Sequence, residues 1–188
     1  MNEQFGLGIS VYRSLNPNEN NYENYKALAK IADNYITKTN KTVKLFAFDS
    51  EHENDIVAAH HIFNLAKMKE NIEIIPYIGD EESFLTNFKE CERMIAIRFH
   101  SAILSDIYKI PFLPIAYSNK MQNLMNDRNF TGELIKLEEL TPEILIDEIV
   151  DKIISGEGLC KNFTTNQGSS NIHFKELEKL LKIDNKKL

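Results

Sequence analysis

The segment MIAIRFHSAIL (residues 94–104) places a cation, an imidazole and a hydroxyl between two apolar runs. Arg98 and His100 lie two positions apart, so in extended backbone both side chains would project to the same side. Ser101 is a natural helix cap, and the free N–H groups of the helical turn beside it attract phosphate or carboxylate. An imidazole, whose reference pKa is about 6.5, can also transfer protons near neutral pH. The segment therefore predicts an anion site that carries an acid–base group.

A second cation, Lys120, follows the next apolar run, PFLPIAY (residues 111–117). Each of these residues also has an ordinary structural explanation. A histidine after a strand is often held by hydrogen bonds, and a lysine at a helix start is usually solvated. Spacing by itself leaves both explanations open. The convergence of Arg98, His100 and Lys120 on one edge of a sheet favours a functional site.

Short β-branched runs alternate with longer amphipathic stretches along the chain, which predicts the elements around these residues. Strands are expected at residues 5–12, 41–49, 72–78, 93–98, 111–117 and 133–137. Helices are expected at residues 21–38, 53–69, 81–91, 101–109, 119–128 and 141–155. Asn54 or Asp55 is placed to cap the second helix, and the sixth begins with Thr141 as cap and Pro142 in the first turn.

Strands that are nearly continuous in apolar residues and alternate with helices are typical of a parallel sheet covered on both faces. We therefore predict an α/β fold with a doubly wound, mostly parallel, Rossmann-like sheet. Ligands bind such sheets at the carboxyl ends of the strands, where the strand order reverses. The joint at Arg98 to Ser101 follows the fourth expected strand, on that side of the sheet.

The predicted organisation has three parts. One Rossmann-like domain is expected over residues 1–155, and a polar, glycine-rich linker follows over residues 156–171. An amphipathic helix and a short tail are expected over residues 172–188.

Composition excludes several classes of protein. The 188 residues are 43% hydrophobic and 27% charged, which is ordinary for a globular domain. A net charge of -6 argues against broad nucleic-acid binding. Cys91 and Cys160 lie far apart without redox or metal spacing, which suits a reducing compartment. The sequence has no signal-peptide pattern and no run long enough to span a membrane, so we expect a cytoplasmic protein. No carboxylate or histidine cluster has metal spacing, and we expect neither a metal nor a cofactor.

The segment RFHSAILSDIYKIPFLPIAYSNKMQNLM resembles the characteristic segment of the polysaccharide pyruvyl transferase family. That family carries an Arg-x-His helix start, a "gvP" strand entry and then Tyr-x-x-Lys. The segments ISVYRS, NDIVAAHHIFNLA and ECERMIAI occur in the family's order, so the resemblance covers roughly residues 5–155. Family members have two Rossmann-like halves of the GT-B type with a cleft between them, and this chain is similar to the second, donor-binding half.

The resemblance implies transfer of enolpyruvate from phosphoenolpyruvate to a sugar, as a ketal, in cell-surface polysaccharide biosynthesis. It assigns catalysis and donor binding to His100 and donor binding to Lys120. Arg98 would give electrostatic support, and the helix start at Ser101 would hold the donor. Arg13 in SVYRS lies one place later than expected and receives a minor substrate-binding role.

The sequence also departs from the family. The donor-contacting arginine of the family's first domain has no counterpart here, so the isolated chain is expected to be inactive. Lys109 replaces the glycine usual before the "gvP" entry. The partners implied are phosphoenolpyruvate, a sugar or lipid-linked saccharide acceptor, and the N-terminal domain of the same enzyme.

Two alternatives remain open. The chain could be the nucleotide-sugar-binding half of a GT-B-type glycosyltransferase or epimerase. That class would usually show a glycine-rich turn and an acidic residue for ribose, and YSNKMQNL has no such turn. The chain could also be a non-catalytic accessory domain that binds a partner.

Overall fold

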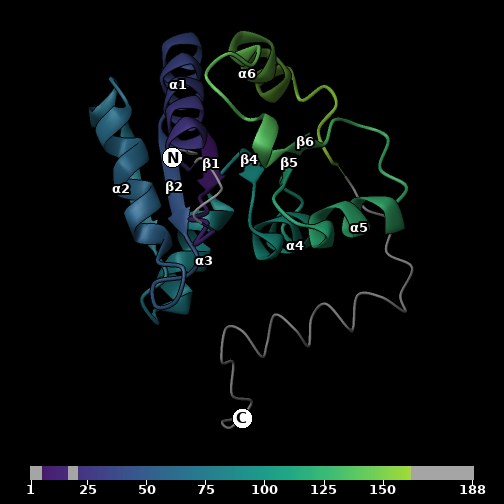
Figure 1. The fold of residues 1–188 in the computed structure, drawn as a ribbon, viewed down its shortest axis with the longest axis horizontal. Coiled ribbons are helices and arrows are strands. Elements are labelled where there is room, and N and C mark those ends of the chain that lie inside the picture. Colours follow the sequence, from purple (N-terminus) through teal and green to yellow (C-terminus); the bar gives the residue numbers. More distant parts are fainter. Residues whose placement is uncertain (1–5, 17–20, 162–188) are drawn as a thin grey trace, which may run out of the picture.

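The computed structural model describes residues 6–16 and 21–161, which form one parallel sheet with helices on both faces (Figure 1). The strands are β1 (Leu7–Ser10), β2 (Val43–Ala47), β3 (Ile72–Pro76), β4 (Arg93–Ala96), β5 (Phe112–Ala116) and β6 (Ile135–Lys136). The helices are α1 (Asn21–Thr39), α2 (Asp55–Leu65), α3 (Glu81–Lys89), α4 (Phe99–Ile107), α5 (Asn119–Asp127) and α6 (Ile146–Ser155). The strand order is β3-β2-β1-β4-β5-β6, and each neighbouring pair is parallel. The predicted Rossmann-like fold is confirmed, and its strand order reverses between β1 and β4.

Two hydrophobic clusters lie on opposite faces of the sheet. Helices α1, α2 and α6 pack on one face, and α3, α4 and α5 pack on the other. Alternate residues of one strand serve the two faces. In β2, Leu45 belongs to the first cluster and Phe46 to the second. The ring of Phe46 lies 5.5 Å from that of Phe84 and 5.2 Å from that of Phe88. Burial on both faces explains why most residues of the central strands are apolar.

The last helix begins later than the sequence predicts. We expected Thr141 as its cap and Pro142 in its first turn, but α6 starts at Ile146. Residues 141–144 instead form a turn, in which the Ile144 N–H donates to the Thr141 carbonyl at 3.1 Å. The turn allows Leu140 and Ile146, on either side of it, to be buried in the same cluster. Tertiary packing therefore overrides a strong local start signal.

The packed part of the chain continues beyond residue 155, where the linker was expected to begin. Leu159 and Cys160 are buried, and the backbone of Cys160 exchanges two hydrogen bonds with Phe112 at 2.8 and 3.1 Å. Both cysteines are free, and burial raises the pKa of each thiol to about 12. The expected helix and tail at 172–188 lie outside the described residues. Within residues 6–16 and 21–161, no helix is long and apolar enough to cross a membrane.

The turn that follows α4 contains a lysine in a conformation that usually belongs to glycine. Lys109 has a φ of 58°, in the left-handed region. The N–H of Ile110 then donates to the carbonyl of Ser105 at 2.8 Å, which closes the helix end. Lys109 therefore adopts the backbone conformation that glycine provides most readily.

Replacing Lys109 with glycine is expected to raise the free energy of unfolding by about 0.5–1 kcal/mol. A left-handed backbone conformation costs an L-residue about 1–2 kcal/mol, and glycine does not bear this cost. Part of the stability gained is lost again, because glycine has the greater conformational entropy in the unfolded chain. The ion pair of Lys109 with Asp106, at 3.6 Å, lies at an exposed side chain and contributes little. Urea unfolding measures the change. Lys109→Ala is the control, because it keeps the strain, and a glycine variant no more stable than the alanine variant would contradict the argument.

Candidate functional site

Ser10, the last residue of β1, forms hydrogen bonds with the residues that connect β4 to α4. Its Oγ accepts hydrogen bonds from the backbone N–H groups of Ile97 (2.8 Å) and Arg98 (3.1 Å). It also shares a hydrogen bond of 2.7 Å with the Oγ of Ser101. All these groups lie where β1 and β4 end side by side, at the point of strand-order reversal. The joint predicted to carry the site is thus held by a buried serine from another strand.

The helix after this joint begins earlier than expected. Arg98 is the N-cap residue, so His100 is the second residue of α4 and Ser101 the third. The expectation that Arg98 and His100 share one side of an extended strand is therefore wrong, as is the N-cap role of Ser101. The physical reason is that Ser101 is fully buried and must satisfy its hydroxyl inside the protein. It does so by donating to the Arg98 carbonyl at 2.6 Å and by bonding to Ser10.

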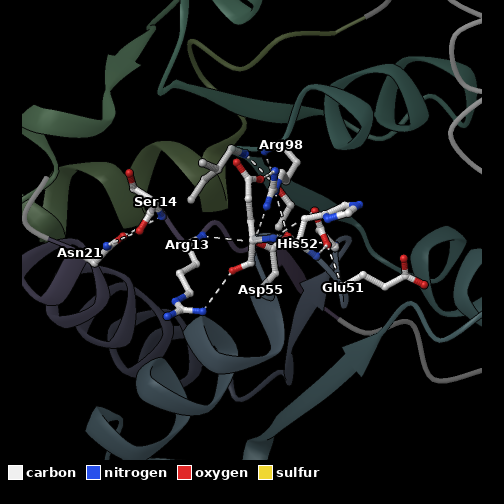
Figure 2. A network of polar contacts seen from close by, with 11 residues as sticks. Arg13, Ser14, Asn21, Glu51, His52, Asp55 and Arg98 are labelled. Atoms are coloured by element: carbon white, nitrogen blue, oxygen red, sulfur yellow. Dashed lines mark hydrogen bonds and ion pairs between the residues drawn. The ribbon is translucent and has the colours of Figure 1, made fainter. Parts of the chain in front are cut away.

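Arg98 lies in a buried network of polar contacts (Figure 2). Its Nε donates to Asp55 Oδ2 at 2.9 Å, and its two terminal nitrogens donate to Asp55 Oδ1 and to Glu53. The guanidinium carbon also lies 4.7 Å from the ring centroid of Tyr12. Burial opposes the charge of Arg98, but hydrogen bonds and charges from Asp55 and Glu53 raise the pKa of Arg98 above its usual value. The carboxylates of Asp55 and Glu53 therefore balance the positive charge of Arg98.

Asp55 connects three loops at this edge of the sheet, and sequence reasoning treated it only as a possible helix cap. Its carboxylate accepts hydrogen bonds from the backbone N–H groups of Asp49 (3.1 Å) and Arg13 (3.2 Å), as well as from Arg98. Burial raises the pKa of Asp55, against the hydrogen bonds from Arg98. The N-cap position belongs to Asn54, which makes no side-chain cap bond. The one available signal was an acidic residue at the start of the apolar helix DIVAAH.

Arg13, the remaining predicted arginine, joins the same network from the loop after β1 through its backbone N–H, which donates to Asp55 (Figure 2). Its Nη1 donates to the carbonyl oxygen of Glu53 at 3.4 Å. The structure thus brings Arg13, Arg98 and Ser101 together around the end of β1. A substrate-binding role for each of the three stays a prediction.

His100 and Lys120 occupy the rim of this edge. His100 is half-buried in the first turn of α4, with its ring 5.9 Å from that of Phe99. Lys120 is exposed in the first turn of α5, and no ion pair of Lys120 is found within the described residues. The strands that precede the two helices are parallel neighbours, so both first turns lie at one sheet edge. An imidazole, an ammonium and two helix N-termini can hold an anion and move a proton.

Comparisons with known proteins identify the family and the fold of the chain. The model of the family described as polysaccharide pyruvyl transferase matches residues 8–119, more than half of the 188 residues. The match includes Arg13, Arg98 and His100, and it ends one residue before Lys120. No curated protein matches the chain.

Two solved structures of a UDP-GlcNAc 2-epimerase from Methanocaldococcus jannaschii are similar in fold. One has 16% sequence identity and a TM-score of 0.56, with 93% of this chain and 46% of that chain covered. The other, a complex with UDP-GlcNAc and UDP, has 17% identity and the same TM-score of 0.56, with 92% and 45% covered. The chain therefore spans less than half the length of these structures, and at such identity the similarity concerns the fold alone. The family match over strands β1 to β5, together with this fold, places the chain in the polysaccharide pyruvyl transferase family.

Proposed function

We propose that this chain is the donor-binding domain of a transferase that moves enolpyruvate from phosphoenolpyruvate to a saccharide, forming a ketal. The observation that carries the proposal is the place of His100. An imidazole stands in the first turn of α4, at the strand-order reversal, in a chain that belongs to the pyruvyl transferase family. The reaction would take place in the cytoplasm, on a sugar or lipid-linked saccharide of a cell-surface polysaccharide.

Donor binding in this proposal uses the rim of the sheet edge. Phosphoenolpyruvate carries a carboxylate and a phosphate, and it needs positive partners on a chain with a net charge of -6. The N–H groups of the first turn of α4, together with the exposed ammonium of Lys120, would hold one end of the donor. Arg98 and Arg13 would act from behind, by keeping the loops that carry these groups in place.

The chemical step in this proposal begins with proton transfer. His100 gives a proton to the methylene carbon of the donor, which becomes a methyl group and leaves a cation-like C2. A sugar hydroxyl adds to C2 and returns a proton to His100. The bond from C2 to the phosphate oxygen breaks, and a second hydroxyl of the sugar closes the ketal while its proton leaves with the phosphate. Positioned proton transfer accelerates reactions by about 10²–10⁴-fold, and the cations that bind the phosphate stabilise its departure.

Donor binding can be tested on the chain itself. Phosphoenolpyruvate at ten times its dissociation constant is expected to stabilise the fold by about 1.4 kcal/mol, which corresponds to roughly 3–6 °C in the melting temperature. His100→Ala and Lys120→Ala are expected to abolish or greatly reduce this shift. His60→Ala, on the exposed face of α2, is the matched control and should retain the full shift.

The same measurement separates the alternatives. A shift with UDP but not with phosphoenolpyruvate would replace the proposal with a nucleotide-sugar-binding domain. No shift with either ligand would support an accessory domain without a donor site. A shift with phosphoenolpyruvate that survives in His100→Ala would remove His100 from the donor site.

A further inference from the structure

A cavity of about 660 Å³ opens at the same edge of the sheet, beside the proposed donor site. Its walls are the start of α1, the start of α5 and the short 3-10 helix after β6 (Leu137–Glu139). The volume falls within the range of about 300–1,000 Å³ that is typical of small-molecule sites. Neither His100 nor Lys120 lines it. The cavity is therefore a second space at this edge, distinct from the donor rim.

The walls of this cavity are fixed by a buried side chain. Asn24 in α1 donates from Nδ2 to the carbonyl oxygens of Leu137 at 2.7 Å and Leu140 at 2.9 Å. These hydrogen bonds join the start of α1 to the segment after β6. A ligand therefore meets a pocket that is already formed, which reduces the ordering cost of binding.

The lining is polar but carries no excess of positive charge. Six neutral side chains in the lining carry a hydroxyl or amide group: Asn24, Tyr117, Ser118, Asn119, Gln122 and Thr141. The charged lining residues are Glu23, Glu138 and Lys136. The ammonium of Lys136 lies 3.9 Å from the carboxylate of Glu138, which balances the positive charge of the lysine. Such a lining is poor for a diphosphate, whereas hydroxyls, amides and carboxylates are suitable partners for the hydroxyl groups of a sugar.

The cavity also shares a wall with the donor site. Tyr117 lines it, and its ring stacks on Tyr12 with centroids 4.0 Å apart. Tyr12 in turn lies under the guanidinium of Arg98, the N-cap residue of the helix that carries His100. On the other side, lining residues Ser118 and Asn119 directly precede Lys120. A molecule in the cavity would therefore lie next to a donor held at the rim.

We propose that this cavity is the acceptor subsite, and that it takes a neutral, uncharged sugar unit of the saccharide. The acceptor role rests on the proposed function, because only a transferase needs a sugar beside its donor. Gln122, exposed at the start of α5, would donate hydrogen bonds to the sugar hydroxyls and accept them through its amide. Glu138, exposed on the 3-10 helix, would accept hydrogen bonds from sugar hydroxyls through its carboxylate.

The experiment is a titration of the labelled chain with three neutral probes, followed by NMR of the backbone amides. The probes are the methyl glycosides of galactose, mannose and N-acetylglucosamine. At least one is expected to shift the amides of residues 117–122 and 136–141. Gln122→Ala and Glu138→Ala should each weaken that binding about fivefold, the effect of one hydrogen bond. Asn123→Ala, one position further on the exposed surface of the same helix, is the matched control and should leave the affinity unchanged.

The outcomes separate this subsite from the donor site. The proposal is overturned if no glycoside shifts these amides at tens of millimolar, or if UDP or inorganic pyrophosphate shifts them instead. It is also overturned if Gln122→Ala binds as well as wild type. If Gln122→Ala loses the glycoside but keeps the thermal shift with phosphoenolpyruvate, both proposals are supported. If a glycoside binds but phosphoenolpyruvate gives no shift, the acceptor role falls together with the proposed function.

Discussion

Replacing Asp55 with alanine is expected to lower the free energy of unfolding by about 3–5 kcal/mol. The substitution leaves the guanidinium of Arg98, which is only 8% exposed, without its main partner, and an uncompensated buried charge costs that much. It also removes the acceptor of two backbone N–H groups, those of Arg13 and Asp49. Urea unfolding followed by circular dichroism measures the loss.

Two variants test whether the loss comes from the unpaired charge. Replacing both partners, in Asp55→Leu with Arg98→Met, should recover much of the stability, because burying two apolar groups of similar size is often neutral. Glu53→Gln changes the half-exposed partner of Arg98 and should cost no more than about 1 kcal/mol. If Asp55→Ala costs as little as Glu53→Gln, the buried pair does not anchor this edge.

Replacing Ser10 with alanine is expected to cost about 2–4 kcal/mol of unfolding free energy. The Oγ of Ser10 accepts the N–H groups of Ile97 and Arg98, and a buried donor left without a partner costs about 1–3 kcal/mol. Because these two groups immediately precede α4, the variant should also reduce the thermal shift with phosphoenolpyruvate. Thermal and urea unfolding, with and without the donor, give both quantities.

Ser105→Ala provides the matched control for Ser10→Ala. Ser105 is also a fully buried serine, but its hydroxyl donates to the carbonyl of Ser101 one turn earlier in the same helix, at 2.7 Å. Within the described residues, no backbone N–H group donates to this hydroxyl, so its loss should cost less than about 1 kcal/mol. Equal losses in the two variants would show that Ser10 acts through its volume and not as an acceptor.

The expected elements differ in how well the local pattern fixes their ends. The helix predicted at residues 21–38 is observed as Asn21–Thr39, because a long apolar stripe and polar flanks define it locally. The helix predicted at 101–109 starts instead at Phe99, since Ser10 on another strand supplies the acceptor for the two preceding N–H groups. Local patterns fix an element when its partners lie within the element, and they fail when a distant residue completes its end.

The candidate site also combines features that the local sequence shows with features that depend on distant residues. Arg98, His100 and Lys120 are identified in the sequence because polar residues interrupt apolar runs just after expected strands. The ion pair of Arg98 could not be predicted from the local sequence, because its partner Asp55 lies 43 positions away. The contact of Tyr12 with Tyr117 likewise joins two loops that only the order of the strands brings together.

The sequence by itself therefore determined the α/β class, the edge that carries the polar residues, and the resemblance that the family match confirms. These depend on local periodicity and on short motifs, which any single stretch of chain displays. Only the tertiary structure decided that Arg98 is held by Asp55, that Ser101 is buried against Ser10, and that a cavity lies beside α5. The reason is that these features come from placing β1 between β2 and β4, and no local pattern encodes which strands become neighbours.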